Sequence, residues 1–140
     1  MKTWVTWVSL AGVTAALGFF LFYANRAGEW SAHHIAGLAI AIPAFCLWAL
    51  ARVQLRKSFA VSAQAKELVT RGIYSKIQNP VYIFGGIFIA GLIIYSGRPL
   101  FFLVFLILIP MQWMRVREER RVLEAKFGDA YREYRRRTWF

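Results

Sequence analysis

The sequence predicts an all-α integral membrane protein with four transmembrane helices, a cytoplasmic connector and a C-terminal amphipathic helix. Two observations support this fold class: 59% of the 140 residues are hydrophobic, and they occur in long runs. A soluble domain of this length has too little interior to bury so many apolar side chains. A third observation is that lysine and arginine are concentrated beside the runs. We therefore expect residues 1–140 to form one membrane domain.

Four apolar runs are long enough, or nearly so, to cross a bilayer, for which about 20 residues are needed. The first run is longer than the apolar core of a signal peptide, so we expect it to be retained as a helix. Pro43 falls in the middle of the second run and should kink that helix. A Ser-Gly-Arg-Pro sequence predicts a tight turn between the third and fourth runs. The expected spans are residues 3–24, 34–53, 80–96 and 99–116.

The distribution of basic residues predicts the orientation in the membrane. Of the 18 lysines and arginines, six lie in residues 52–76 and nine in residues 115–137, whereas the two other loops hold one each. The positive-inside rule therefore places the connector (residues 54–79), the tail (residues 117–140) and both termini in the cytoplasm. Membrane topology and anionic lipid headgroups account for the net charge of +11 better than nucleic acid does. We expect the membrane, and not a nucleic acid, as the partner.

The sequence offers little material for a metal site. Cys46 is the only cysteine, which excludes an intrachain disulfide and a cluster of thiol ligands. Because it lies inside an apolar run, we expect it to be buried in helix packing. His33 and His34 are adjacent, so on a helix their side chains point about 100° apart and make a poor pair of ligands. We expect both histidines at the membrane interface, and no bound metal.

The stretch from Leu68 to Gly86 joins the connector to the third apolar run. Asn79 is a favourable N-cap residue and Pro80 a favourable first helical residue, so a helix should begin here at the membrane surface. The free N–H groups of such a helix start can hold a carboxylate or a phosphate. Asn79 and Pro80 can equally mark no more than the beginning of a membrane helix. These residues alone do not decide between an anion-binding site and a plain helix start.

The segment after the fourth run carries charge and an amphipathic pattern. Arg115, Glu118 and Glu119 have the spacing of a surface ion pair along a helix, which would contribute only a few tenths of a kcal/mol. Gly128-Asp129 predicts a break, with Asp129 capping a second short helix. Apolar and aromatic side chains recur at helical spacing through the tail, at Val116, Leu123, Phe127, Tyr131 and Tyr134.

Two segments together resemble a known family. Residues 70–82, TRGIYSKIQNPVY, are similar to the TxGxYxxxRHPxY element of the isoprenylcysteine carboxyl methyltransferase and phospholipid methyltransferase superfamily. A second element of that superfamily, RxxEE…L…FGxxYxxY, is matched downstream, and the resemblance covers roughly residues 52–137. The residues in register are Thr70, Gly72, Tyr74, Asn79, Pro80 and Tyr82 in the first element, and Arg115, Glu118, Glu119, Leu123, Phe127, Gly128, Tyr131 and Tyr134 in the second. Gln78 stands where the family usually has Arg, and Phe84 where it usually has Gly.

The resemblance implies an integral-membrane methyltransferase that uses S-adenosylmethionine. The acceptor would be a lipid-like or prenylated carboxylate or amine that enters from the bilayer. Glutamates would suit the α-ammonium group of the cofactor, an arginine or the helix start its carboxylate, and tyrosines its adenine. Glu119 and Arg115 are the expected catalytic residues. The expected cofactor-binding residues are Tyr74, Gln78, Asn79, Pro80, Tyr82, Arg115, Glu118 and Glu119.

Two other functions stay open from the sequence. A nicotinamide-dependent membrane reductase is one, because some sterol reductases have a similar C-terminal half, although this chain is short for that class. A non-catalytic membrane adaptor that keeps the fold is the other, and the departure at Gln78 favours it. Methyl transfer depends on aligning the reacting groups more than on acid–base catalysis. The absence of a dedicated histidine or lysine base is therefore compatible with the methyltransferase hypothesis.

Overall fold

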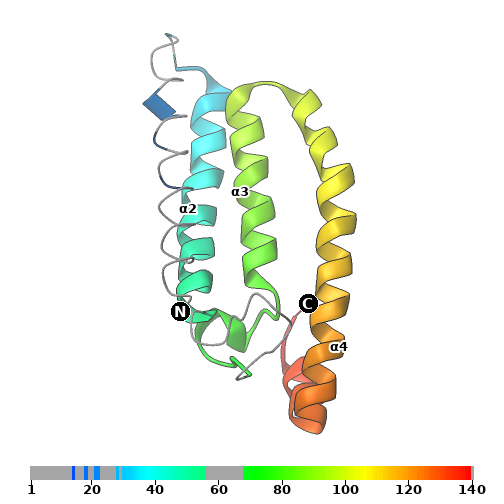
Figure 1. Cartoon of the computed structure of the whole chain (residues 1–140). Coiled ribbons are helices and arrows are strands. Elements are labelled where there is room, and N and C mark those ends of the chain that lie inside the picture. Colours follow the sequence, from blue (N-terminus) through cyan, green and yellow to red (C-terminus); the bar gives the residue numbers. More distant parts are fainter. Residues whose placement is uncertain are drawn as a thin grey trace.

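The protein is described here by a computed structural model that places residues 14, 18, 21–22, 28, 30–55 and 68–139. Three α-helices and two 3-10 helices account for the ordered elements of this part of the chain, and no strand is found in it. The helices are α2 (Ala32–Leu55), η1 (Gly72–Ser75), α3 (Pro80–Ser96), η2 (Pro99–Val104) and α4 (Phe105–Arg137). The long helices run side by side, with the connector and the end of the tail together at one end, the connector end (Figure 1). The all-helical class is thus confirmed, while most of the first expected span and residues 56–67 of the connector lie outside the described residues.

Two helical stretches are long and apolar enough to cross a membrane. They are α2 and the combined stretch of η2 and α4, Pro99–Arg137. Helix α3 is as apolar but has only 17 residues, below the length of a typical span. Length and composition therefore support two of the four expected spans among the described residues.

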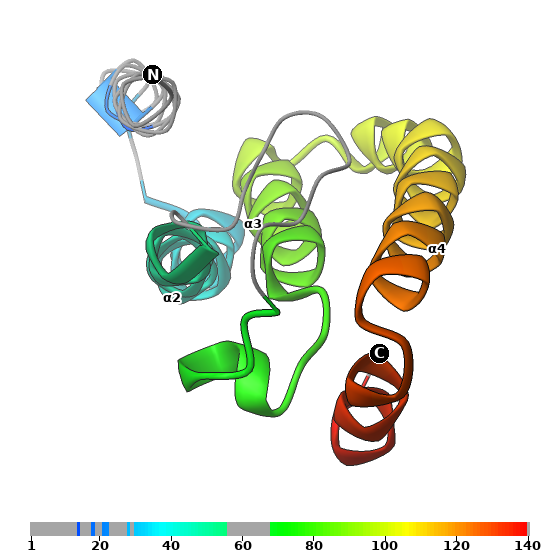
Figure 2. The ribbon, with the colours of Figure 1, turned by 60° about the horizontal axis from the view of Figure 1, so that its bottom comes forward.

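Small residues bring α2 and α3 into direct backbone contact. A Cβ atom on Gly37 would collide with the backbone of Tyr95, and one on Gly91 would come within 2.7 Å of the backbone nitrogen of Ala41. Gly37 on α2 and Gly91 on α3 thus lie at points of close approach between the two helices. Such approach allows extensive van der Waals contact, which drives helix association in a bilayer. The α2–α3 pair is the closely packed part of the molecule (Figures 1 and 2).

The expectation that Cys46 is buried in helix packing is wrong. It is exposed on α2 and is not part of the helix packing. The face of α2 that meets α3 carries the buried residues Gly37, Ala41, Ala44 and Ala51. Cys46 follows Ala44 by two positions, which turns its side chain about 200° around the helix axis. An apolar run alone does not reveal which face of the helix is buried.

The turn between α3 and α4 forms as expected, and the helical stretch that follows it extends beyond the apolar run. Gly97 adopts a left-handed conformation, with φ of 64°, and its N–H donates to Ile94 O at 3.0 Å. Residues 99–104 then form the 3-10 helix η2 and not the first turns of an α-helix. Helix α4 continues without a break past residue 116 into the tail. The charged residues there are good helix formers, so nothing local stops the helix where the apolar run ends.

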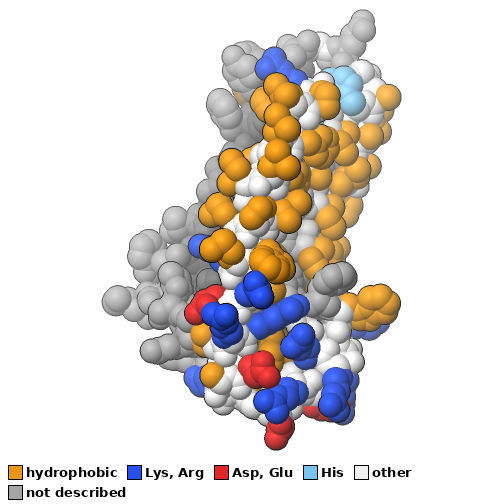
Figure 3. Space-filling model, turned by 90° about the vertical axis from the view of Figure 1, so that its right-hand side faces the viewer, with side chains coloured by type: hydrophobic (Ala, Val, Ile, Leu, Met, Phe, Trp, Pro, Cys, Tyr) orange, Lys and Arg blue, Asp and Glu red, His pale blue; other side chains and the backbone are white. Residues whose placement is uncertain are grey.

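The apolar half of α4 is uncovered by the rest of the described chain. Its large side chains are exposed, among them Leu106 (72%), Ile107 (64%) and Met114 (67%). Figure 3 shows hydrophobic side chains over the upper part of this face, with charged side chains gathered at its lower end. At the boundary the Arg117 guanidinium lies over the Trp113 ring, 4.3 Å from its centroid. Exposed apolar side chains that end at an arginine–tryptophan contact are typical of a lipid-facing helix at the membrane interface.

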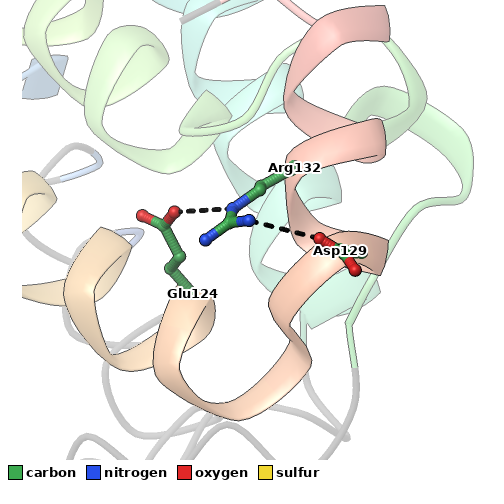
Figure 4. A network of polar contacts seen from close by, with 3 residues as sticks. All are labelled: Glu124, Asp129 and Arg132. Atoms are coloured by element: carbon green, nitrogen blue, oxygen red, sulfur yellow. Dashed lines mark hydrogen bonds and ion pairs between the residues drawn. The ribbon is translucent and has the colours of Figure 1, made fainter.

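The helix in the tail is broken at Gly128, as the sequence predicts, and the chain reverses its direction there. Gly128 has φ of 50° and ψ of −121°, which an L-residue rarely adopts. Arg132 joins the two sides of the break, because it donates to Glu124 Oε1 at 3.1 Å and to Asp129 Oδ1 at 3.2 Å (Figure 4). The last helical turns then run back toward the connector (Figures 1 and 2).

Candidate functional site

The connector is attached to the end of α2 through η1. Gln54 on α2 accepts a hydrogen bond from the Ile73 N–H at 3.0 Å. Gly72 has φ of 63°, and a Cβ atom there would collide with the Gln54 side-chain amide. Both its backbone conformation and this lack of space require glycine at position 72. This gives a physical reason for the glycine of the first sequence element.

Tyr74 is a structural anchor in this arrangement. Its hydroxyl donates to Ala51 O at 3.3 Å, and its side chain is buried. Burial raises the pKa of the Tyr74 phenol, which therefore stays protonated and keeps donating this bond. The expected adenine contact would have to come from the ring, because the hydroxyl is already engaged with α2.

Helix α3 begins at Pro80, as expected, but without the expected side-chain cap. Pro80 is fully buried, and Asn79 makes no side-chain capping hydrogen bond. Instead, Asn79 O accepts from the N–H groups of Tyr82 and Ile83, each at 3.2 Å. The Ile83 bond is the ordinary first bond of an α-helix, but the Tyr82 N–H would otherwise be free, so this start has less anion-binding capacity than the sequence suggests.

Gln78 lies immediately before this helix start. Its backbone N–H donates to Trp139 O at 3.1 Å. Its side-chain oxygen Oε1 is buried and has no hydrogen-bond partner among the described residues. A buried acceptor without a partner is costly in a folded protein, so it suggests a group that binds there.

Tyr82 and Glu119 join the two sequence elements. The Tyr82 hydroxyl on the first turn of α3 donates to Glu119 Oε1 on α4 at 2.5 Å. This is the length of a strong hydrogen bond from a hydroxyl to a carboxylate. The contact links residues 37 positions apart and brings α3 and α4 together near the connector end.

The Glu119 carboxyl group is partly withdrawn from water. Burial raises its pKa, while the Tyr82 hydrogen bond and the Arg115 charge act in the opposite direction. Arg115 lies one helical turn before Glu119 and is exposed. A half-buried carboxylate of this kind is suited to bind a cation, because the low dielectric strengthens the attraction.

Glu118 is directed away from this cluster. Its side chain is 66% exposed and lies 4.0 Å from that of Arg121, which is 81% exposed. Such a surface pair contributes little to stability. Adjacent helical residues point about 100° apart, so only one of the two glutamates can face Tyr82. The structure brings together Tyr82, Glu119 and Arg115, and it leaves Glu118 outside.

The sequence profile of the phospholipid methyltransferase family matches residues 32–130. The chain belongs to the phospholipid methyltransferase family. This confirms the resemblance seen in the sequence, and the family match includes both Tyr82 and Glu119. No curated protein and no solved structure matches the chain.

The family match ends before the last part of the site. Tyr134 and Trp139, which contact the connector, lie beyond residue 130. The aromatic stripe of the tail includes Tyr134 but gives no partner for it. Trp139 carries no sequence signal, because its contacts are made by main-chain atoms.

The two histidines lie far from this cluster, at the opposite end of α2. Their ring centroids are 4.2 Å apart, and His34 also packs edge-on against Tyr95. Within the described residues no group of three or more histidine, cysteine, aspartate or glutamate side chains could hold a metal ion.

Proposed function

We propose that this protein transfers a methyl group from S-adenosylmethionine to a lipid-like acceptor that enters from the bilayer. The observation that carries the proposal is the Tyr82–Glu119 hydrogen bond, which unites the two family elements in one half-buried cluster. Membership of the phospholipid methyltransferase family supports a methyltransferase. The cofactor and the acceptor are parts of the proposal.

The residues of the cluster fit the chemical groups of the cofactor. Glu119 would hold the α-ammonium group, and Arg115 would face the α-carboxylate. The buried Gln78 Oε1 offers an acceptor for a further N–H group. Asn79 and Pro80 would shape the wall at the helix start, with the rings of Tyr74 and Tyr82 beside the adenine. When bound, S-adenosylmethionine supplies an activated methyl group on a sulfonium centre.

The position of the cluster suits an acceptor from the bilayer. The exposed apolar side chains of α4 extend to Trp113 and Met114. Glu119 follows Trp113 by six residues, a rise of about 9 Å along the helix. An amphiphile that lies against α4 would therefore bring its polar group near Glu119. A carboxylate acceptor needs no deprotonation, whereas an amine acceptor would need a base, for which a glutamate is the available residue type.

The cluster would face the cytoplasm. The support is the concentration of lysine and arginine in the connector and the tail. Reporter domains fused after Arg98 should therefore be found on the outer side of the membrane. A cytoplasmic signal at that position would contradict this orientation.

Calorimetric titration of the purified protein in detergent tests the proposal. Wild-type protein should bind S-adenosylmethionine, and Glu119→Gln should weaken binding roughly ten- to a hundredfold, because a charged hydrogen bond contributes about 1.5–3 kcal/mol. Glu118→Gln is the matched control and should change the affinity little, since its side chain faces solvent. Equal affinities of wild type and Glu119→Gln would remove Glu119 from the site.

The same titration separates the competing functions. Binding of a nicotinamide nucleotide in place of S-adenosylmethionine would favour a reductase. Binding of neither would favour an adaptor. With S-adenosylmethionine bound, a parallel assay of amine-bearing and carboxylate-bearing lipids would identify the acceptor class by the appearance of products that carry one additional methyl group.

A further inference from the structure

The end of the tail is paired with the connector through main-chain atoms. Residues 134–139, the return segment, follow the reversal at Gly128 and lie beside residues 74–78. The Trp139 N–H donates to Lys76 O at 2.7 Å, and Trp139 O accepts from the Gln78 N–H at 3.1 Å. These two bonds form a parallel β-bridge between Ile77 and Trp139.

A side-chain bond strengthens this pairing at its other end. The Tyr134 hydroxyl donates to Tyr74 O at 2.7 Å. Burial raises the pKa of Tyr134 to about 12, so the hydroxyl remains a donor at neutral pH. Thr138 donates from Oγ1 to Tyr134 O at 2.9 Å, which ties the last residues back to the helix. The return segment therefore contacts the connector at Tyr74 and again at Lys76 and Gln78.

These contacts hold the residues that lead into the proposed site. Gln78 is bonded to Trp139 through its N–H and is followed directly by Asn79 and Pro80. Its side-chain oxygen is buried without a partner in the described chain. The orientation of that oxygen depends on the backbone at Gln78, and hence on the return segment. A misplacement of about 1 Å at such a site can cost a hundredfold in rate.

We propose that the return segment is a clamp that positions Gln78 and the start of α3 for ligand binding, with the main chain of Trp139 as its positioning group. This inference rests on the proposed function, because the ligand is S-adenosylmethionine. It goes beyond the family match, which ends at residue 130.

The main-chain character of the clamp allows a sharp test at one residue. Trp139→Pro removes the N–H that bonds to Lys76 O. Thr138, which precedes it, has φ of −120° and ψ of 154°, the extended conformation that a residue before proline prefers. Trp139→Ala keeps both main-chain bonds and removes only a side chain that is 74% exposed. The two variants therefore separate the bond from the ring.

Affinity for S-adenosylmethionine and thermal unfolding should be measured together for both variants. Trp139→Pro should weaken binding roughly three- to tenfold, the effect of one neutral hydrogen bond, with little change in unfolding temperature. Trp139→Ala should bind S-adenosylmethionine with nearly the affinity of wild type. Tyr134→Phe keeps the ring, removes the bond to Tyr74 O, and should weaken binding to a similar extent.

Hydrogen–deuterium exchange of residues 72–80 without ligand provides the readout that does not depend on the cofactor. Faster exchange in Trp139→Pro than in Trp139→Ala is expected. If wild type binds S-adenosylmethionine and both position-139 variants bind equally well, the clamp is refuted and the proposed function stands. If wild type does not bind, the proposed function fails and the positioning role fails with it. The hydrogen–deuterium exchange of residues 72–80 then shows only whether the pairing of the return segment with the connector stabilises the fold.

Discussion

Helices α2 and α3 and helices α3 and α4 are joined in different ways. The first pair is held by backbone contact at Gly37 and Gly91, with alanines filling the interface. The second pair is joined near one end by the polar contact between Tyr82 and Glu119, while the apolar half of α4 stays exposed. Van der Waals packing therefore holds α2 and α3 together as a rigid pair, which supports the start of α3 at the candidate site. Polar side chains carry the α3–α4 contact, and these are the side chains that a ligand can engage.

The same contrast separates the two ends of the molecule. At the turn end a single left-handed glycine, Gly97, connects α3 to η2. At the connector end, η1, the start of α3, the middle of α4 and the return segment are linked by hydrogen bonds. A site that needs exact placement of a few polar groups is better built on such a network than on one turn.

Gly91→Ala should have the largest effect, and it tests the scaffold. The added Cβ would meet the backbone of Ala41, which cannot move aside as a side chain can. Overpacking of this kind typically costs about 1–3 kcal/mol. Gly86→Ala is the matched control on the same helix, because the nearest atom there is Phe105 Cε1 at 3.9 Å. Thermal unfolding in detergent should show a large loss for the first variant and none for the second, and similar curves would contradict the close packing.

A smaller effect is expected from the Tyr82–Glu119 bond. Tyr82→Phe leaves the Glu119 carboxylate without its hydroxyl donor, which should cost about 1 kcal/mol because the half-buried carboxylate can still be reached by water. A double-mutant cycle with Glu119→Gln should show non-additivity of at least about 0.5 kcal/mol, because the residues are in contact. The corresponding cycle of Glu118 with Arg121 should be near zero, since both side chains are exposed. Additive effects at Tyr82 and Glu119 would mean that the bond does not join the helices.

Local sequence signals predicted the local structure well. Pro80 marks the start of α3, Gly97 its end, and Gly128 the break in the tail, because each of these residues restricts or frees its own backbone. The signals failed where the answer depends on another element. The exposure of Cys46 depends on which face of α2 meets α3, and the sequence of α2 alone does not show this.

The candidate site shows the same limit. Its members Tyr82, Glu119 and Arg115 were found through the resemblance, which also implied Glu118; that role stays a prediction, while the structure directs the Glu118 side chain toward solvent. Only the rotation of α4 relative to α3 decides which glutamate faces the site. The contact of Trp139 with the connector was missed altogether, because main-chain pairing leaves no trace in residue type.

The smallest expected effect is the pH dependence that Glu119 gives to the stability of the ligand-free protein. Burial raises the pKa of this carboxyl group above its ordinary value of 4.5. The folded state then binds the proton more tightly than the unfolded chain does. The stability that this provides is present below the ordinary pKa and is lost as the pH rises through the raised one. Wild type should therefore lose stability over this window relative to Glu119→Gln, as measured by thermal unfolding.

Cofactor binding should show the opposite dependence on pH. If Glu119 binds the α-ammonium group, only the ionised carboxylate does so effectively, and affinity should rise as the pH passes through the raised pKa. Glu118→Gln should keep this rise, and Glu119→Gln should abolish it. In wild type, stability should fall and cofactor affinity should rise with increasing pH, and only Glu119→Gln should remove both dependences. This result would show that the half-buried carboxylate of Glu119 is unfavourable when the site is empty and favourable when a cation is bound. Parallel slopes would show that Glu119 serves the α3–α4 contact and not the ligand.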